Sequence, residues 1–309
     1  MPYTHPSVNL WIPDRVGHGA IGELPAGVAL GLVPREGELP PAILDAEFLV
    51  PSAGDRRLAA VLPRMSSLRV IQTLSAGVDR LLELVPPGVT LCDARGTRDI
   101  AVSEWVLATI LAAQKMLPKA WEHQRRHAWY RGETDELAGR TVMILGYGSI
   151  GAAVEARLNP FQARLIRVAR RARPCVHPVQ ELRELLPLAD VVVVLLPLTE
   201  QTTGLLDGDA LAQMRPGALL VNAARGQIVD SRALLDLLLA GRIRAALDVT
   251  DPEPLPDDHP LWDAPGVLIT PHIAGDTPAS EVRAFELVGE QVRRYVRGEE
   301  LLNVVEGGY

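Results

Sequence analysis

The sequence predicts an α/β protein of two domains, the larger built on a doubly wound parallel sheet. Residues 141–151 read as an apolar strand that runs into three glycines at G-x-G-x-x-G spacing, and good helix formers follow. Short apolar runs alternate with helix-like stretches before and after this turn, as in parallel α/β folds. The tail after residue 275 is too short to fold alone, so we expect it to complete the first domain. The predicted domains are therefore 1–98 with 276–309, and 99–275.

The first domain is predicted to be a small parallel α/β unit. Its expected strands cover 8–12, 28–33, 47–50, 70–74 and 89–92, with a helix over 55–62. The turn after the fourth strand, Ser75-Ala76-Gly77, can present successive backbone N–H groups as an anion-binding nest. An ordinary strand-to-helix turn explains the same residues equally well.

An apolar helix from Asp99 to about Leu117 is predicted to lead out of the first domain. Segment 119–137 that follows is polar and basic, yet it contains Trp121, Trp129 and Tyr130. Large aromatic side chains in a charged segment are typical of a surface that contacts a partner, and a second copy of the chain is the simplest partner. We therefore expect a homodimer, with packing of the rings on their own domain as the alternative.

Each glycine of the central turn has a physical reason. Gly146 allows a positive φ, Gly148 lets the backbone approach a pyrophosphate, and Gly151 permits close packing of helix on strand. The N–H groups at the start of the helix then face the anion. A dinucleotide site is predicted here, because the strand before the turn and the helix after it are the context that the motif needs.

The second domain continues in regular alternation. Strands are predicted over 141–145, 165–169, 190–196, 218–223, 245–249 and 267–270, and helices over 181–186, 209–214 and 231–240. Six strands are the number of a doubly wound dinucleotide-binding sheet. In the tail we expect an amphipathic helix over 278–296 and a last strand over 302–305.

The composition excludes several classes of function. The net charge of -7 and the lack of a long basic run argue against a nucleic-acid partner. Cys92 and Cys175 lack metal-type spacing, which indicates a reducing compartment and predicts no metal site. The first residues do not resemble a signal peptide, and the apolar runs are too short to cross a bilayer. We therefore expect a soluble cytoplasmic protein without a membrane partner.

An arginine, an acid and a histidine are predicted to meet at one edge of the second sheet. Arg225, Glu253 and His272 follow its fourth, fifth and sixth strands, and open α/β sheets bind ligands at the carboxyl ends of their strands. A protonated imidazole can donate a proton to a carbonyl oxygen, a carboxylate can orient the imidazole, and a guanidinium can bind a substrate carboxylate. Together they suit the reduction of a 2-oxo acid, although each residue alone also fits a structural role.

At these residues the sequence resembles the D-isomer-specific 2-hydroxyacid dehydrogenase family, and is most similar to its glyoxylate and hydroxypyruvate reductases. The resemblance covers nearly the whole chain and rests on five motifs in register, at 146–151, 196–203, 221–230, 248–256 and 270–275. It implies an NAD(P)-dependent oxidoreductase with a Rossmann domain and a smaller flavodoxin-like substrate domain.

The resemblance also implies roles for single residues. His272 is the implied acid–base with Glu253 as its support, and Arg225 binds substrate together with His272. The substrate carboxylate is expected on the backbone of Ala76 and Gly77, beside Ser75, and Asp248 is expected to contact the nicotinamide amide. The predicted cofactor site comprises Gly146, Tyr147, Gly148, Ser149, Ile150, Gly151, Arg170, Arg171, Pro197, Thr203, Ala223, Arg225, Asp248, His272 and Gly275.

The end of the second strand of this domain predicts the choice of cofactor. Folds that select NAD usually carry an acid there for the ribose hydroxyls, whereas this chain has Ala169 and then Arg170-Arg171. Arginines attract a 2′-phosphate, with about 1.5–3 kcal/mol for each charged hydrogen bond. We therefore expect NADP(H) to be preferred, and a basic turn that also accepts NAD(H) is the alternative.

A small 2-oxo acid such as glyoxylate or hydroxypyruvate is the expected substrate, with a D-2-hydroxy acid as product. Trp11, Ser75, Trp105 and Trp129 of the partner subunit are candidates for the pocket lining. A dinucleotide-sensing corepressor and a phosphite or formate dehydrogenase on the same scaffold stay open as alternatives. Glu253 argues against formate, because the formate enzymes of this fold carry glutamine at that position.

Overall fold

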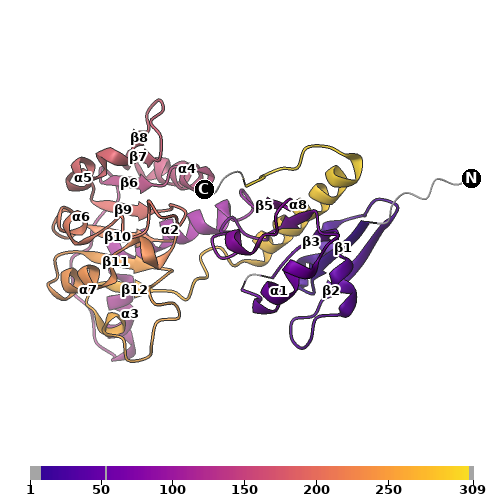
Figure 1. Ribbon diagram of the computed structural model, residues 1–309. Coiled ribbons are helices and arrows are strands. Elements are labelled where there is room, and N and C mark those ends of the chain that lie inside the picture. Colours follow the sequence, from indigo (N-terminus) through magenta and orange to yellow (C-terminus); the bar gives the residue numbers. More distant parts are fainter. Residues whose placement is uncertain (1–7, 53, 306–309) are drawn as a thin grey trace, which may run out of the picture. The chain divides into compact units, whose positions relative to one another are not determined.

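Two compact units make up the chain in the computed structural model, which describes residues 8–52 and 54–305 (Figure 1). Unit 1 comprises 1–98 and 276–309, and unit 2 comprises 99–275. Each unit contains one parallel sheet with helices packed on it.

Unit 1 is built on a five-stranded sheet in the order β2-β1-β3-β4-β5, the order of flavodoxin-like doubly wound folds. Helix α8 packs on this sheet although it is distant in sequence (Figure 1), and its Phe285 and Val288 share a core with Leu10 and Phe48 of the strands. The elements are β1 (Val8–Pro13), β2 (Val28–Val33), β3 (Phe48–Leu49), α1 (Arg56–Val61), β4 (Val70–Gln72), β5 (Thr90–Cys92) and α8 (Pro278–Arg297).

Unit 2 contains a seven-stranded parallel sheet in the order β12-β11-β10-β9-β6-β7-β8. The strand order reverses at β6, which lies between β7 and β9, and such a reversal is where doubly wound sheets bind ligands. The elements are α2 (Asp99–Gln114), α3 (Leu117–Arg125), β6 (Thr141–Leu145), α4 (Ser149–Leu158), β7 (Arg164–Ala169), β8 (His177–Pro178), α5 (Leu182–Leu185), β9 (Val191–Val194), α6 (Gly208–Ala212), β10 (Leu219–Asn222), α7 (Ser231–Leu239), β11 (Arg244–Leu247) and β12 (Val267–Ile269).

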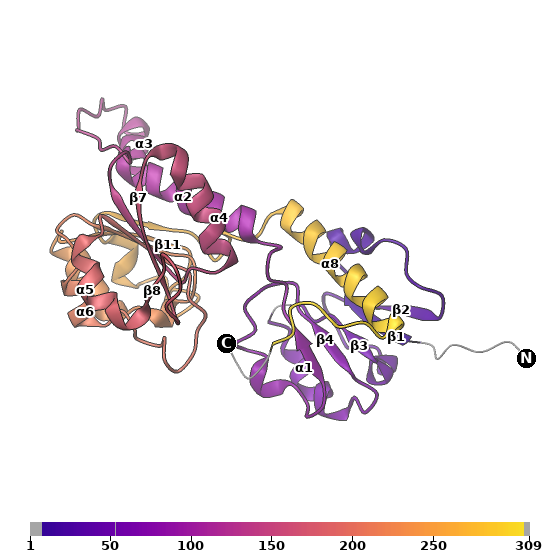
Figure 2. The same ribbon diagram turned by 90° about the horizontal axis from the view of Figure 1, so that it is seen from above.

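Both faces of the unit 2 sheet are covered, which explains its continuous apolar strands. Helices α2 and α4 lie on one face and α5 and α6 on the other (Figure 2). Val106 of α2 and Val154 of α4 pack against Ile144 and Val193 of the first face, whereas Leu186 and Leu211 belong to the core of the second. The four residues of β9 are all fully buried valines.

Three expectations from the sequence are wrong in detail. Residues 302–305 form no strand, because Val304 makes only an isolated bridge to Cys92. The unit 2 sheet has a seventh strand, β8, which is two residues long and therefore leaves no periodic signal. The helix expected to continue to Leu117 ends at Gln114, and α3 begins after Met116, whose φ of 53° is left-handed.

Within the described ranges, no single helix is long and apolar enough to cross a membrane. Helices α2 and α3 reach that length and apolar composition only when taken together, and the chain bends by 65° between them.

Candidate active site

The glycine turn after β6 has the conformation that its sequence predicts. Gly146 has a φ of 107°, and a Cβ there would lie 2.6 Å from the carbonyl carbon of Leu195. A Cβ on Gly151 would lie 3.0 Å from the oxygen of Gly146, so helix α4 packs tightly on the turn. At Gly148 nothing lies within 4 Å of that position, which leaves the backbone open for a diphosphate to approach.

Tyr147, the second residue of this turn, is held by two charged side chains. Its hydroxyl donates to Glu155 Oε2 at 2.6 Å, and Arg167 binds both Glu155 oxygens at 2.6 and 2.7 Å. The Arg167 guanidinium thereby holds the pKa of Glu155 below its usual value, and Glu155 raises the pKa of Tyr147. Ser149, the first residue of α4, donates to Asp99 at 3.2 Å, and Ile150 follows in the first turn of the helix.

The basic turn after β7 contains an arginine that the sequence reasoning did not assign. Arg170 and Arg171 are exposed after the strand, as expected. The chain then turns back through an antiparallel bridge between Arg173 and Val176. Arg173 donates to the carbonyl oxygen of Tyr147, and its guanidinium carbon lies 5.5 Å from the centre of that ring. Pro174 directly after it was the available signal for this reversal of the chain.

Arg225 lies in the loop that follows β10, and the loop is shaped by a buried asparagine. Asn222 donates from Nδ2 to the carbonyl oxygen of Arg225 at 3.0 Å and accepts the N–H of Ala224 at 3.0 Å. A Cβ on Gly226 would lie 2.0 Å from the carbonyl oxygen of Thr250, so only glycine permits this approach. The Arg225 loop is therefore held against the loop that follows β11.

His272 and Glu253 form the hydrogen-bonded pair that the sequence predicts. His272 Nδ1 lies 2.8 Å from Glu253 Oε1, and the two side chains are 42% and 27% exposed. The loop of Glu253 is shaped by Thr250, whose hydroxyl donates to the carbonyl oxygen of Pro252 at 2.8 Å. With Nδ1 on the carboxylate, Nε2 is the imidazole nitrogen that can exchange a proton with a ligand.

The backbone of His272 is in the left-handed region, with a φ of 56°. A conformation of this kind costs a non-glycine residue on the order of 1–3 kcal/mol and persists only where neighbours hold it. Asp248, which is 3% exposed, accepts the N–H of Ile273 at Oδ1 and the N–H of Ala274 at Oδ2, both at 2.9 Å. The His272 N–H donates to the Asp248 carbonyl oxygen at 2.8 Å.

In unit 1, the predicted anion nest lies in a loop with defined hydrogen bonds. The Thr73 hydroxyl donates to the Ser75 carbonyl oxygen at 2.6 Å, and the Ser75 hydroxyl donates to the Gly77 carbonyl oxygen at 3.3 Å. Ser75, Ala76 and Gly77 are half-buried. Behind the loop, the buried Gln72 donates to the carbonyl oxygens of Thr73 and Asp93, at 2.9 Å each.

The remaining predicted cofactor residues follow strands of unit 2. Pro197 accepts the Thr202 hydroxyl at 2.7 Å, and the Thr203 hydroxyl donates to Thr199 at 2.8 Å, so this turn is internally bonded. Ala223 is half-buried after β10, and Gly275 is buried after the His272 loop. Trp11, a candidate for the pocket lining, packs over Gly31 within unit 1.

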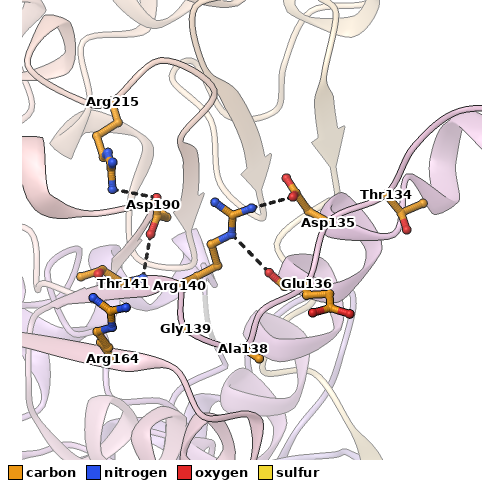
Figure 3. A pocket seen from close by; sticks show the side chains of 10 residues that line it. All are labelled: Thr134, Asp135, Glu136, Ala138, Gly139, Arg140, Thr141, Arg164, Asp190 and Arg215. Atoms are coloured by element: carbon orange, nitrogen blue, oxygen red, sulfur yellow. Dashed lines mark hydrogen bonds and ion pairs between the residues drawn. The ribbon is translucent and has the colours of Figure 1, made fainter.

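A cavity of about 560 Å³ lies at the amino ends of the unit 2 strands, whereas the glycine turn lies at their carboxyl ends (Figure 3). Its lining includes Arg140, Arg164 and Asp190, at the amino ends of the strands. Arg140 pairs with Asp135 at 2.6 Å and Arg215 with Asp190 at 3.0 Å, as the dashed lines in Figure 3 show. These four charges already have partners, and the cavity is remote from the glycine turn along the strands.

Comparison with known proteins assigns the chain to a family. Residues 107–274 match the family described as D-isomer specific 2-hydroxyacid dehydrogenase, NAD binding domain. The chain is 33% identical over 310 residues to D-3-phosphoglycerate dehydrogenase of Mycobacterium tuberculosis (strain ATCC 25618 / H37Rv), with 96% of this chain covered. It spans only 58% of that relative's length. Glyoxylate reductase of Thermofilum pendens is 33% identical over 281 residues, which cover 86% of this chain and 83% of that protein.

A solved structure agrees with this assignment. The D-isomer specific 2-hydroxyacid dehydrogenase of Xanthobacter autotrophicus Py2, in complex with NADPH and MES, has a TM-score of 0.82 at 28% identity, and the match covers 96% of this chain and 98% of that one. The chain belongs to the D-isomer-specific 2-hydroxyacid dehydrogenase family, and its larger unit has the dinucleotide-binding fold of that family. The open glycine turn fits a dinucleotide, and no cluster of three metal-ligating side chains occurs in the part of the chain that the structure describes.

The lowered pKa of Glu155 predicts a pH-dependent stability. Because the pKa is lower in the folded chain, the ionised carboxylate stabilises the fold above the unfolded value of about 4.3, and this contribution is lost as the pH falls through the folded pKa. We expect Glu155→Gln to lower the free energy of unfolding by about 1–2 kcal/mol at neutral pH. The difference from the parent should shrink below about pH 4. Denaturant unfolding at both pH values measures it.

The matched control is Glu122→Gln, which removes an exposed carboxylate that pairs with Arg126. It should change stability by less than about 0.5 kcal/mol. A Glu155→Gln difference that stays constant with pH contradicts the stabilising role of the ionised carboxylate.

Proposed function

We propose that the chain reduces a small 2-oxo acid, of the glyoxylate or hydroxypyruvate kind, to the D-2-hydroxy acid. The observation that carries this proposal is the His272–Glu253 pair, whose ring nitrogen and carboxylate oxygen are 2.8 Å apart. Glu253 follows β11 and His272 follows β12, so the pair lies at the carboxyl ends of the strands. The glycine turn after β6 lies at the same end of the sheet. The named glyoxylate reductase relative supports the substrate class.

The proposed role of His272 is to exchange a proton with the substrate oxygen. NADPH, when bound, supplies the hydride that reaches the carbonyl carbon. Imidazolium Nε2 donates its proton to the carbonyl oxygen in the same step, and the ring is left neutral. Glu253 on Nδ1 holds the orientation of the ring.

The proposed donors to the substrate carboxylate are one guanidinium and two backbone N–H groups. The Arg225 guanidinium has the planar fork that binds a carboxylate at two points, and backbone N–H groups of Ala76 and Gly77 supply further donors. A substrate held by its carboxylate places its 2-oxo carbon at a fixed distance from that contact. Small 2-oxo acids share this carboxylate, so we expect activity with several of them.

NADP(H) is the proposed cofactor, with NAD(H) accepted more weakly. Three arginines of the turn after β7 support it, and Arg173 also contacts the glycine turn through the Tyr147 carbonyl oxygen. The related structure from Xanthobacter contains NADPH. We propose that Arg170, Arg171 and Arg173 together bind the 2′-phosphate.

A homodimer is the proposed assembly. Three large apolar side chains in and after α3 are exposed, namely Leu117, Trp121 and Trp129, and Trp129 is 87% exposed. Large aromatic rings that stay in contact with water are typical of protein interfaces. A second copy of the chain is the simplest partner, because every solution of this protein contains one.

Absorbance of the reduced nicotinamide tests the activity, with glyoxylate, hydroxypyruvate, pyruvate and phenylpyruvate as substrates. We expect turnover of the small 2-oxo acids, and His272→Asn should lower kcat by at least about 100-fold because it removes the proton donor. The matched control is His177→Asn, which removes an exposed His–Glu pair of similar geometry, with 2.7 Å between His177 and Glu181. Equal activity of the His272 variant and the parent overturns the assignment.

Replacement of the basic turn tests the cofactor proposal. Arg173→Ala, and separately the double variant Arg170→Ala with Arg171→Ala, should raise KM for NADPH by about 10-fold to 100-fold because charged hydrogen bonds to the 2′-phosphate are lost. KM for NADH should change less than about threefold. Arg164→Ala, at the other end of β7, is the control. A parallel change of both KM values contradicts the phosphate contact.

Mass measurement at micromolar concentration tests the assembly. We expect a particle of twice the chain mass of 33.5 kDa. The double variant Trp121→Ser with Trp129→Ser should shift the particle to the monomer mass, because association then no longer buries these two apolar rings. Leu239→Ser, which removes a 58% exposed leucine of α7, should leave the particle unchanged. A monomeric parent excludes this interface.

A further inference from the structure

A chain of hydrogen bonds connects helix α2 to the loop that carries His272. Trp105 Nε1 donates to Thr270 Oγ1 at 3.1 Å, and Thr270 Oγ1 donates to Asp248 Oδ1 at 2.6 Å. The Asp248 carboxylate in turn accepts the backbone N–H groups of Ile273 and Ala274. The chain therefore reaches from α2 to the two residues that follow His272.

The direction of this chain is fixed by the groups that form it. An indole nitrogen can only donate a hydrogen bond, whereas a hydroxyl has one proton and two lone pairs. Thr270 therefore accepts from Trp105, and its single proton goes to Asp248. Trp105 and Thr270 are half-buried and Asp248 is buried, so water competes little for these groups.

The loop needs such support because of its backbone. His272 has a φ of 56° and lies two residues after Thr270 and one before Ile273. The imidazole keeps its 2.8 Å contact with Glu253 only while that conformation persists. A carboxylate that is free to rotate would hold the two N–H groups less well, and the Thr270 hydroxyl removes part of that freedom.

We propose that Trp105 and Thr270 are positioning residues for the acid–base histidine. The indole fixes the hydroxyl, the hydroxyl fixes the Asp248 carboxylate, and the carboxylate holds His272 in its left-handed conformation against Glu253. Trp105 thus acts through the loop, which differs from the pocket-lining role that its sequence position indicates. The inference rests on the proposed function of His272.

Kinetics of isosteric variants test the proposal. Thr270→Val removes the hydroxyl and should lower kcat about tenfold, while KM for NADPH changes less than about twofold. Thr270→Ser, which keeps the hydroxyl, should restore most of kcat. Trp105→Phe should lower kcat about threefold. The double variant should match Thr270→Val alone within about twofold, because the indole acts only through the hydroxyl.

Thr109→Val is the matched control, one helical turn further along α2. It removes a buried hydroxyl that, among the described residues, donates to the carbonyl oxygens of Trp105 and Val106 and not to the His272 loop. If Thr270 had only a structural role, Thr109→Val and Thr270→Val would lower kcat by the same factor when they lower Tm by the same amount. That result, or independent additive effects of the Trp105 and Thr270 changes, overturns the proposal.

Hydrogen–deuterium exchange separates this inference from the proposed function. The amides of Ile273 and Ala274 should be protected in the parent and should exchange about tenfold faster in Thr270→Val, with no change in Thr109→Val. Unchanged exchange overturns the positioning role even in an active enzyme. Faster exchange in a chain that turns over none of the 2-oxo acids supports the positioning of the loop and contradicts the proposed function.

Discussion

The candidate site depends on the hydrogen bonds that the carboxylate of Asp248 accepts. It is buried directly after β11 and accepts hydrogen bonds from one hydroxyl and two backbone N–H groups. A buried carboxylate without partners would be costly, and each charged hydrogen bond contributes about 1.5–3 kcal/mol. The left-handed backbone of His272 costs about 1–3 kcal/mol, which these bonds offset. The strain of the histidine and the burial of the acid therefore explain one another.

The parallel sheet gives this arrangement its place. Each of β10, β11 and β12 ends at the same edge, so loops from three strands bring Arg225, Glu253 and His272 to one side of unit 2. Two contacts keep the loops in register: the backbone of Gly226 lies against Thr250, and the Asp248 carboxylate accepts hydrogen bonds from the two residues after His272. The glycine turn follows β6 at the point where strand order reverses, which is where a dinucleotide fits.

The sequence predicts the parts of this structure that depend on local patterns. Strand β6, the three glycines and the amphipathic α8 follow from periodicity and backbone sterics, and the fold class follows from their order. The His272–Glu253 contact was predictable because both residues follow parallel strands. β8, with two residues, is too short to show a period, and residues 302–305 include three apolar residues without forming a strand. The contact of Arg173 with Tyr147 depends on how the turn after β7 folds back, which no local pattern encodes. The contact of Trp105 with Thr270 joins residues 165 positions apart, which no local pattern encodes either.

The most direct test of a histidine that exchanges the substrate proton is the pH dependence of both reaction directions. In the proposed reaction, reduction consumes a proton and oxidation releases one at the same imidazole. With rising pH, kcat/KM should fall for the 2-oxo acid and rise for the D-2-hydroxy acid, in mirror fashion. Profiles in which both directions respond to pH in the same sense would contradict a single histidine that acts as acid in one direction and as base in the other.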